Sequence, residues 1–407
     1  MPALALEWLN LVLRWVHVIA GIMWIGDSFL FMWMDRNLVP PSRARDGAVA
    51  GELWMVHSGG FYEVVKRQSL TPNEVPPHLH WFMWEAYTTW LSGIFLLGVV
   101  YYLGGALYLV DRTVSAIGVG AAIGTSLGVI AIGYLLYEAL WRSPLGRRPA
   151  LAASLSFGLI IAADWGLTHL FSGRAAFIHV GAVLGTIMAA NVAHHIIPAQ
   201  RKMLAATRAG QPVDTALGEQ AKRRSIHNHY LTFPVLFTML SSHFPATYGH
   251  PQAWLVLTLL VIVGVAAKVV MNFRGRSNRW VMAAGLAALA AVITLTTRVP
   301  GSSTAAPDLA HAPPVSFAEA RVIIERRCVT CHARHPSNPS FAEPPAGVVF
   351  DGPEAIRRFA PRIMERVVVT KTMPLGNLTG MTEDERSTLG AWIAHGARVD
   401  SSATGGR

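Results

Sequence analysis

Two cysteines and a histidine near the carboxyl end have the spacing of a covalent haem attachment site. Cys328 and Cys331 are the only cysteines among the 407 residues, and His332 follows directly, which gives the pattern C-x-x-C-H. Thiols at this spacing can add across the two vinyl groups of a haem while the adjacent histidine ligates the iron. The pentapeptide therefore predicts one c-type haem and an electron-transfer role.

Two other interpretations of the cysteine pair fit less well. A structural zinc site needs four cysteine or histidine ligands, and the only further histidine close by is His335. A thioredoxin-like redox pair needs a surrounding βαβ pattern, and no alternation of apolar and polar residues flanks the motif. Haem attachment is thus the favoured interpretation.

The sixth iron ligand of such a haem is usually a methionine sulfur or a second imidazole. Met373 precedes Pro374 in an irregular segment, and a proline-fixed loop can direct a side chain at iron without breaking a helix. Met364 lies within a helical pattern, where a core position is the simpler interpretation. We predict Met373 as the ligand, with Met381 and His395 as alternatives.

The composition of the chain is that of a membrane protein. Hydrophobic residues make up 52% and charged residues 14%, and the mean hydropathy is +0.37, which is outside the range of soluble proteins of this length. Apolar stretches long enough to cross a bilayer, about 20 residues each, recur along the chain. We predict eight spans, at residues 8–34, 79–103, 113–141, 149–171, 175–197, 225–243, 252–271 and 280–298.

The formal net charge of +10 invites a nucleic-acid interpretation, but most basic residues of the first 300 lie in alternate loops between the predicted spans. These loops contain Arg36, Arg43, Arg45, Lys66, Arg67, Arg142, Arg147, Arg148, Arg201, Lys202, Arg208, Lys222, Arg223, Arg224, Lys268, Arg274, Arg276 and Arg279, whereas the opposite loops have Arg112, Arg174 and Arg298. The positive-inside rule then places both termini outside the cytoplasm, in the compartment where haem is attached to thiols. We predict a multi-pass protein of the bacterial inner membrane, surrounded by lipid, with both termini periplasmic and no nucleic-acid partner.

The fold class we expect is all-α, in three parts. Residues 1–298 form an eight-helix transmembrane bundle, residues 299–315 a linker rich in proline, alanine and serine, and residues 316–407 a small periplasmic cytochrome c domain. In that domain Thr382, followed by acidic residues, predicts a capped helix start. The loop 35–78 is too ordered in composition to be a plain tether.

Polar residues inside the predicted spans are costly and indicate function. His17, His80, Asn191 and His194 lie deep in apolar sequence, and for each a functional role and a structural one remain equally open. Such groups suit a polar substrate pocket or the axial ligands of a second, non-covalent haem. A relay of this kind, or a pocket on the outer side, would shorten an electron path that otherwise crosses about 30 Å of hydrocarbon.

Several short stretches of the chain resemble one known family. The stretches are Arg14-Trp15-Val16-His17-Val18, His57-Ser58-Gly59-Gly60-Phe61-Tyr62, Trp90-Leu91-Ser92-Gly93, Asn191-Val192-Ala193 and Ile197-Pro198-Ala199-Gln200, joined to Cys328 to His332 and to Thr372-Met373-Pro374-Leu375-Gly376-Asn377. Together they are similar to the membrane-bound cytochrome c urate oxidases, also called urate hydroxylases. The resemblance implies oxidation of urate to 5-hydroxyisourate in purine degradation. It also implies that electrons pass to the respiratory chain, through a downstream cytochrome c or terminal oxidase, without production of hydrogen peroxide.

Urate is a planar anion, so its pocket requires amide and cationic donors and a base. Side chains of suitable type are His17, His57, Asn191 and His194, which we take as the catalytic candidates, with Gln200 and Arg201 as further ones. The first predicted span also loosely resembles small membrane proteins in which a histidine there binds haem b. We therefore keep His17 as a candidate ligand of such a haem.

Two functions from other classes remain as alternatives. One is a respiratory subunit that carries electrons from quinol through intramembrane haems to the c-type haem, with no substrate oxidation of its own. The other is a transporter or sensor with a cytochrome tail, which would predict internal inverted repeats. We detect no such repeats in the sequence.

Overall fold

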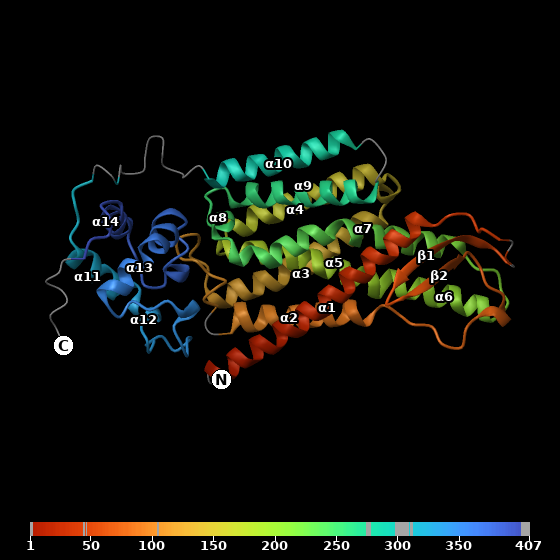
Figure 1. Cartoon of the computed structure of the whole chain (residues 1–407), viewed down its shortest axis with the longest axis horizontal. Helices are drawn as coiled ribbons and strands as arrows, with labels where there is room; N and C mark the ends of the chain where they lie inside the picture. Colours follow the sequence, from red (N-terminus) through yellow and green to blue (C-terminus); the bar gives the residue numbers. More distant parts are fainter. Residues whose placement is uncertain are drawn as a thin grey trace.

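A computed structural model describes residues 3–43, 45, 47–103, 106–273, 278–297, 309 and 312–399. Most of these residues are helical, and they form a long helical bundle with a small helical domain at one end (Figure 1). The bundle comprises α1 (Ala3–Asn37), α2 (Trp84–Leu97), α3 (Val119–Arg142), α4 (Pro149–Thr168), α5 (Gly173–Asn191), α6 (Ile197–Arg208), α7 (Thr215–Leu240), α8 (Pro245–Tyr248), α9 (Ala253–Asn272) and α10 (Arg279–Thr297).

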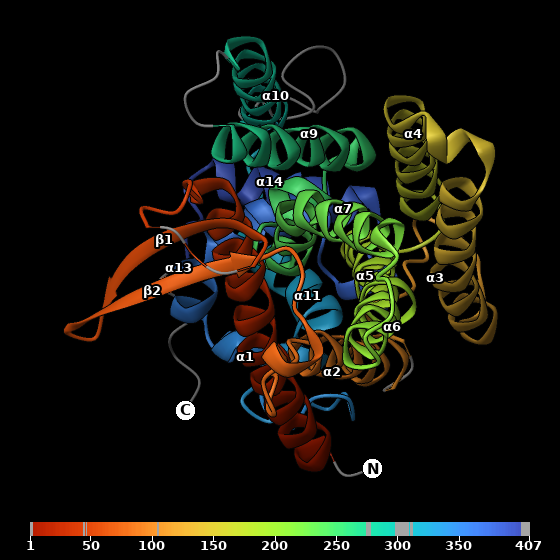
Figure 2. The same ribbon diagram turned by 90° about the vertical axis from the view of Figure 1, so that its right-hand side faces the viewer.

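The inside of the bundle is formed mainly by α5 and α7, and the pairs α1–α2, α3–α4 and α9–α10 lie around them (Figure 2). Alanines and β-branched residues of α5 fill the centre, and Phe177, Ala175 and Ala176 are fully buried. By contrast, α1 leaves large apolar side chains exposed along its length, including Trp8, Trp15 and Ile22. Contiguous apolar surface of this kind is expected where a helix faces lipid.

Six helical segments of the described chain are long and apolar enough to cross a membrane, fewer than the eight predicted. They are α1, α3, α4, the continuous segment Gly173–Arg208, α9 and α10. The predicted spans 79–103 and 225–243 do become helices, but neither meets this measure. The first is short because α2 begins only at Trp84 and changes at Gly98 into the π-helical turn η2 (Gly98–Tyr102). The second belongs to α7, whose amino-terminal half is polar.

The all-α prediction needs correction between α1 and α2. There the chain forms an antiparallel hairpin of β1 (Val49–His57) and β2 (Gly60–Arg67). Ser58 and Gly59 both have positive φ, +50° and +75°, as a two-residue type I′ hairpin turn requires. The flanking valines and aromatic residues favour strands. The hairpin lies at the end of the bundle opposite the small domain (Figure 1).

Glu52 of β1 fixes the hairpin to the chain that follows α1. Its carboxylate accepts hydrogen bonds from Ser42 N (2.7 Å), Ser42 Oγ (2.6 Å) and Arg45 Nε (2.7 Å), and a backbone bridge joins Val39 to Glu52. The Ser42 donors, followed by Arg45, lower the pKa of Glu52 to about 2. The described part of residues 35–78 therefore includes a hairpin with specific contacts, and is more than a plain tether.

The C-terminal domain consists of α11 (Phe317–Arg327), α12 (Val329–His332), α13 (Pro353–Ile363), the π-helical turn η7 (Met364–Val369) and α14 (Glu383–Ala394). Their apolar faces meet around Phe317, Ile324, Ile356 and Trp392. Thr382 caps α14 as predicted, because its side chain accepts from Glu385 N. The predicted linker 299–315 lies mostly outside the described residues.

The bundle has two chemically different ends. The start of α1 and the C-terminal domain lie at one end, and the hairpin and α6 lie at the other (Figure 1). Among the described basic residues of the loops predicted to be cytoplasmic, Lys66 and Arg67 belong to β2, and Arg201, Lys202 and Arg208 belong to α6.

Candidate functional site

The C-x-x-C-H segment lies on a short helical turn. Cys328 ends α11, and α12 begins at the next residue, so that Cys331 N and His332 N both donate to Cys328 O, at 3.1 and 3.0 Å. Both thiols are free rather than joined in a disulfide. Burial raises the pKa of Cys328 to about 12 and also raises that of Cys331. Because neither sulfur is part of a disulfide, both are available for thioether bonds.

His332 is held with one nitrogen free. Its Nδ1 donates to Val348 O at 3.0 Å, and the ring lies 5.3 Å from that of Phe350. This hydrogen bond leaves Nε2 as the nitrogen that can ligate iron, a common way of orienting a ligand histidine. Burial lowers the pKa of His332, which favours the neutral ring that a metal requires.

A cavity of about 1220 Å³ opens beside this turn, between the C-terminal domain and the bundle. Cys328, Cys331 and His332 line it, and so do apolar side chains of the same domain: Val348, Phe350, Phe359, Ile363 and Val367. Two free thiols, an oriented imidazole and an apolar wall are the features that a covalently bound porphyrin requires. The residues present thus fit a c-type haem.

Only one of the four candidate sixth ligands faces this cavity. Met373 lines it, whereas Met364, Met381 and His395 do not. Met381 is instead buried in the core of the domain, and His395 Nδ1 donates to Ala391 O. Met373 thus stays the proposed ligand.

Arg386 holds the loop that carries Met373, and the sequence analysis did not single it out. The guanidinium is 3% exposed, and its Nη1 donates to Met373 O at 2.7 Å and to Val367 O. An arginine in the middle of a helical pattern is usually predicted to lie on the surface. Its hydrogen bonds to the carbonyls of Met373 and Val367, 13 and 19 residues away, could therefore not be predicted.

A buried polar cluster lies in the other half of the bundle, and we call it the α3–α5–α7 cluster. Its members are Tyr137, Glu138, Asn191, His195, Arg224, His227 and Asn228. Asn191 is at the centre. Its Nδ2 donates to Tyr137 Oη at 3.0 Å and to Asn228 Oδ1 at 2.9 Å, and its Oδ1 accepts from Arg224 Nη1 at 3.3 Å.

Glu138 balances the charge of this cluster. It pairs with Arg224 at 3.0 Å, with His195 at 2.8 Å and with Arg142. Tyr137 Oη also bonds His227 Nδ1 at 2.7 Å. The π-helical turn η4 (Val192–Ile196) follows Asn191 directly, and such turns occur frequently at functional sites.

The structure does not gather the four catalytic candidates into one site. Asn191 belongs to the α3–α5–α7 cluster, while His194 bonds Tyr134 Oη at 2.8 Å on an exposed face. His17 lies between α1 and α2, where its Nδ1 contacts Thr89 O at 2.9 Å; Nε2 is the nitrogen left for a ligand. His57 is exposed at the hairpin turn.

The fold and the site define a class of protein. It is mostly helical, with several helices long and apolar enough to cross a membrane. Its C-terminal domain places two thiols and an imidazole on one cavity. The family model described as urate oxidase N-terminal matches residues 3–297. The chain belongs to this urate oxidase family, which points to an oxidoreductase acting on urate. Comparison with curated proteins and with solved structures gives no match.

Proposed function

We propose that this chain oxidises urate to 5-hydroxyisourate in purine degradation and passes the electrons through a covalent c-type haem to the respiratory chain. The main observation behind this proposal is that one chain contains two parts. A bundle of the urate oxidase family spans residues 3–297, and Cys328, Cys331 and His332 face a cavity that adjoins that bundle.

The reaction balances without molecular oxygen. Urate and one water give 5-hydroxyisourate, two protons and two electrons. When bound, the haem supplies a one-electron acceptor, so the two electrons leave in successive steps, and a downstream cytochrome c or terminal oxidase receives them. Because oxygen is not the acceptor, hydrogen peroxide is not a product.

We assign each residue of the C-terminal cavity a role that matches the chemistry of its side-chain atoms. The sulfurs of Cys328 and Cys331 would tether the haem, and His332 Nε2 and Met373 would bind its iron. We keep His17, His57, Asn191 and His194 as catalytic candidates, and His17 also as the ligand of a haem b.

Location is part of the proposal. We propose that the bundle crosses the bacterial inner membrane with its hairpin end toward the cytoplasm, because the basic loops predicted from the sequence favour that side. The termini and the C-terminal domain are then periplasmic, where a soluble electron acceptor can reach them.

The test is turnover by the detergent-purified holoprotein with and without oxygen. We expect urate to be consumed anaerobically when ferricyanide is present, with two ferricyanides reduced per urate, and no peroxide to form in air. A Cys328→Ser/Cys331→Ser variant should lose this activity. Peroxide formed in proportion to urate would contradict the proposal, and reduction by quinol but not by urate would favour the respiratory-subunit alternative.

A further inference from the structure

The cavity beside the C-x-x-C-H turn has a second wall that belongs to the bundle. Tyr108, His169, Arg174, Tyr248 and His250 line it from that side. Its volume of about 1220 Å³ exceeds the range of about 300–1,000 Å³ that is typical of pockets for one small molecule. A cavity of this size can hold more than one small group.

Arg174 is the cation of this wall, and its guanidinium has a hydrogen-bonding neighbour in Tyr101. It lies in the first turn of α5, with Cζ 4.6 Å from the centre of the Tyr108 ring. Its Nε is buried without a hydrogen-bond partner, and Arg174 has no ion pair within the described part of the chain. A buried donor without an acceptor costs free energy, so this group is suited to an anion that enters the cavity.

Most of the other charged side chains that line the cavity already have an ion-pair or hydrogen-bond partner. Arg327 pairs with Glu385 at 3.0 Å, Lys371 with Glu383 at 2.6 Å, and Arg366 with Glu365 at 3.7 Å. The carboxylate of Asp111 accepts from Thr113 N and Thr113 Oγ1 at 2.9 and 2.6 Å. Arg362 also has no ion pair among the described residues, but it is an exposed residue of the opposite wall.

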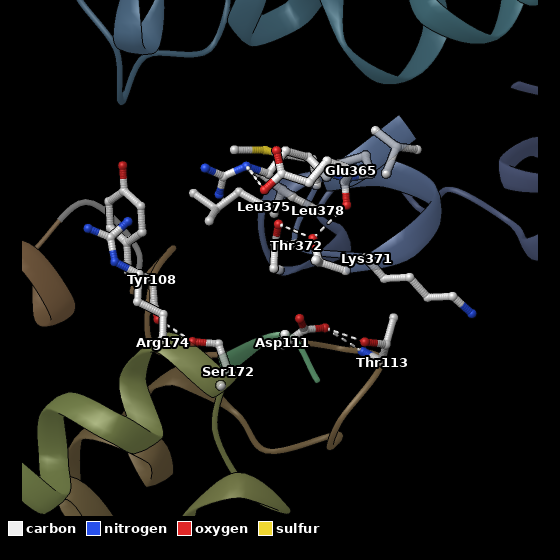
Figure 3. A pocket seen from close by; sticks show the side chains of 18 of the residues that line it. Tyr108, Asp111, Thr113, Ser172, Arg174, Glu365, Lys371, Thr372, Leu375 and Leu378 are labelled. Carbon is white, nitrogen blue, oxygen red and sulfur yellow. Dashed lines mark hydrogen bonds and ion pairs between the residues drawn. The ribbon is translucent and has the colours of Figure 1, made fainter. Parts of the chain in front are cut away.

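Figure 3 shows the arrangement of the two walls. Tyr108 and Arg174 lie side by side on the bundle, and Glu365, Lys371, Thr372, Leu375 and Leu378 face them from the C-terminal domain. A guanidinium fork next to an aromatic face can bind the edge of a planar anion by charge-assisted hydrogen bonds while the ring stacks.

We infer that Arg174 and Tyr108 form the urate-binding wall of this cavity, so that the substrate lies between the bundle and the haem. The inference rests on the proposed function and names its substrate site. It places donor and acceptor in one cavity, so no electron has to cross the bundle. It assigns substrate binding to this wall and not to the candidates His17, His57, Asn191 and His194, none of which lines the cavity. His169 lines the same cavity with Nδ1 bonded to Trp165 O at 2.6 Å, which leaves its Nε2 as a proton acceptor near the ligand.

The test measures urate binding separately from turnover. Holoprotein kept reduced with dithionite cannot oxidise urate, so equilibrium dialysis with labelled urate gives the dissociation constant directly. Loss of a charge-assisted hydrogen bond predicts a Kd about tenfold or more higher in Arg174→Gln. Arg174→Lys, which keeps the charge but not the fork, should fall between the two. Arg362→Gln on the opposite wall should bind as the wild type does. Haem content confirms that each variant is folded.

A haem propionate is also an anion that a guanidinium binds by charge-assisted hydrogen bonds, and a redox titration without urate separates the two anions. An unchanged midpoint potential with weakened urate binding supports the assignment. A shifted potential with unchanged urate binding would show that Arg174 holds the propionate and would overturn it, as would no change in either quantity. Wild-type protein that binds urate through Arg174 yet is not reduced by it would refute the proposed function and leave the site standing.

Discussion

At the scale of the residue, the proposed haem ligands show what the spacing of residues in the sequence can predict. The spacing of Cys328, Cys331 and His332 is enough to predict a shared site, since all three residues lie on one helical turn. Met373 could be favoured because of the proline that follows it. Arg174 could not be found, since the unbonded state of its Nε depends on side chains that approach from distant parts of the chain.

The identity of the sixth ligand yields a prediction about redox potential. In Met373→His a second imidazole replaces the thioether, and the midpoint potential should fall because methionine ligation raises it. We expect a drop on the order of 0.1 V, well within the roughly 0.8 V that axial ligands span. A spectroelectrochemical titration measures it, with Met364→Leu as the control. If the control shifted and the Met373 variant did not, Met373 would not be the ligand.

Asn191 yields a prediction about stability. Asn191→Ala leaves Tyr137, Arg224 and Asn228 short of partners in a buried site, and an unpaired buried group costs about 1–3 kcal/mol. The thermal midpoint of the detergent-solubilised protein should therefore fall. His194→Ala should change it much less, since the contact of His194 with Tyr134 is exposed. Equal midpoints for the two variants would speak against a structural role for the cluster.

At the scale of the element, hydropathy predicts where helices lie better than it predicts their lengths. All eight predicted spans contain helix, but η2 ends the second and a polar half precedes the sixth. The hydropathy pattern of a sequence does not show where such π-helical turns occur, because they are rare, local features of a helix. The hairpin lies within residues 35–78, for which the composition predicts only an ordered loop.

The hairpin provides a prediction about pH. Because the pKa of Glu52 in the folded protein, about 2, lies below its unfolded value of about 4.3, its stabilising effect is full above pH 4.3 and is lost as the pH falls toward 2. Pepsin, which is active in this range, should cleave the hairpin of Glu52→Gln faster than that of the wild type at pH 4. The two rates should converge near pH 2. A difference that persists unchanged to pH 2 would exclude Glu52 as the cause.

At the scale of the whole molecule, the loop that carries Met373 is also the loop that contacts the bundle. Arg112 N donates to Gly376 O at 3.4 Å, and a Cβ at Gly376 would lie 2.6 Å from Val110 O. A Cβ at Gly249 would lie 2.8 Å from Thr370 O. Glycine therefore lets two backbones approach closely where the domains meet, an arrangement that no single-chain pattern predicts.

This contact predicts that the two domains work as one unit. Gly376→Ala should push the loop off the bundle and slow haem reduction by urate about tenfold or more, since small displacements in a site can cost up to 10²-fold. Gly380→Ala is the matched control. The φ of Gly380 is also positive, +67°, but a Cβ added there would lie 3.8 Å from its nearest neighbour, Arg327 Nη1. Stopped-flow absorbance measures both. Equal rates would show that the close approach is irrelevant to electron transfer.

The most direct test of the central claim is anaerobic addition of urate to the oxidised, detergent-purified holoprotein while the haem spectrum is recorded. We predict prompt reduction of the c-type haem, with one 5-hydroxyisourate formed for every two haems reduced. A haem that stays oxidised with urate, yet is reduced by dithionite or quinol, would contradict the account.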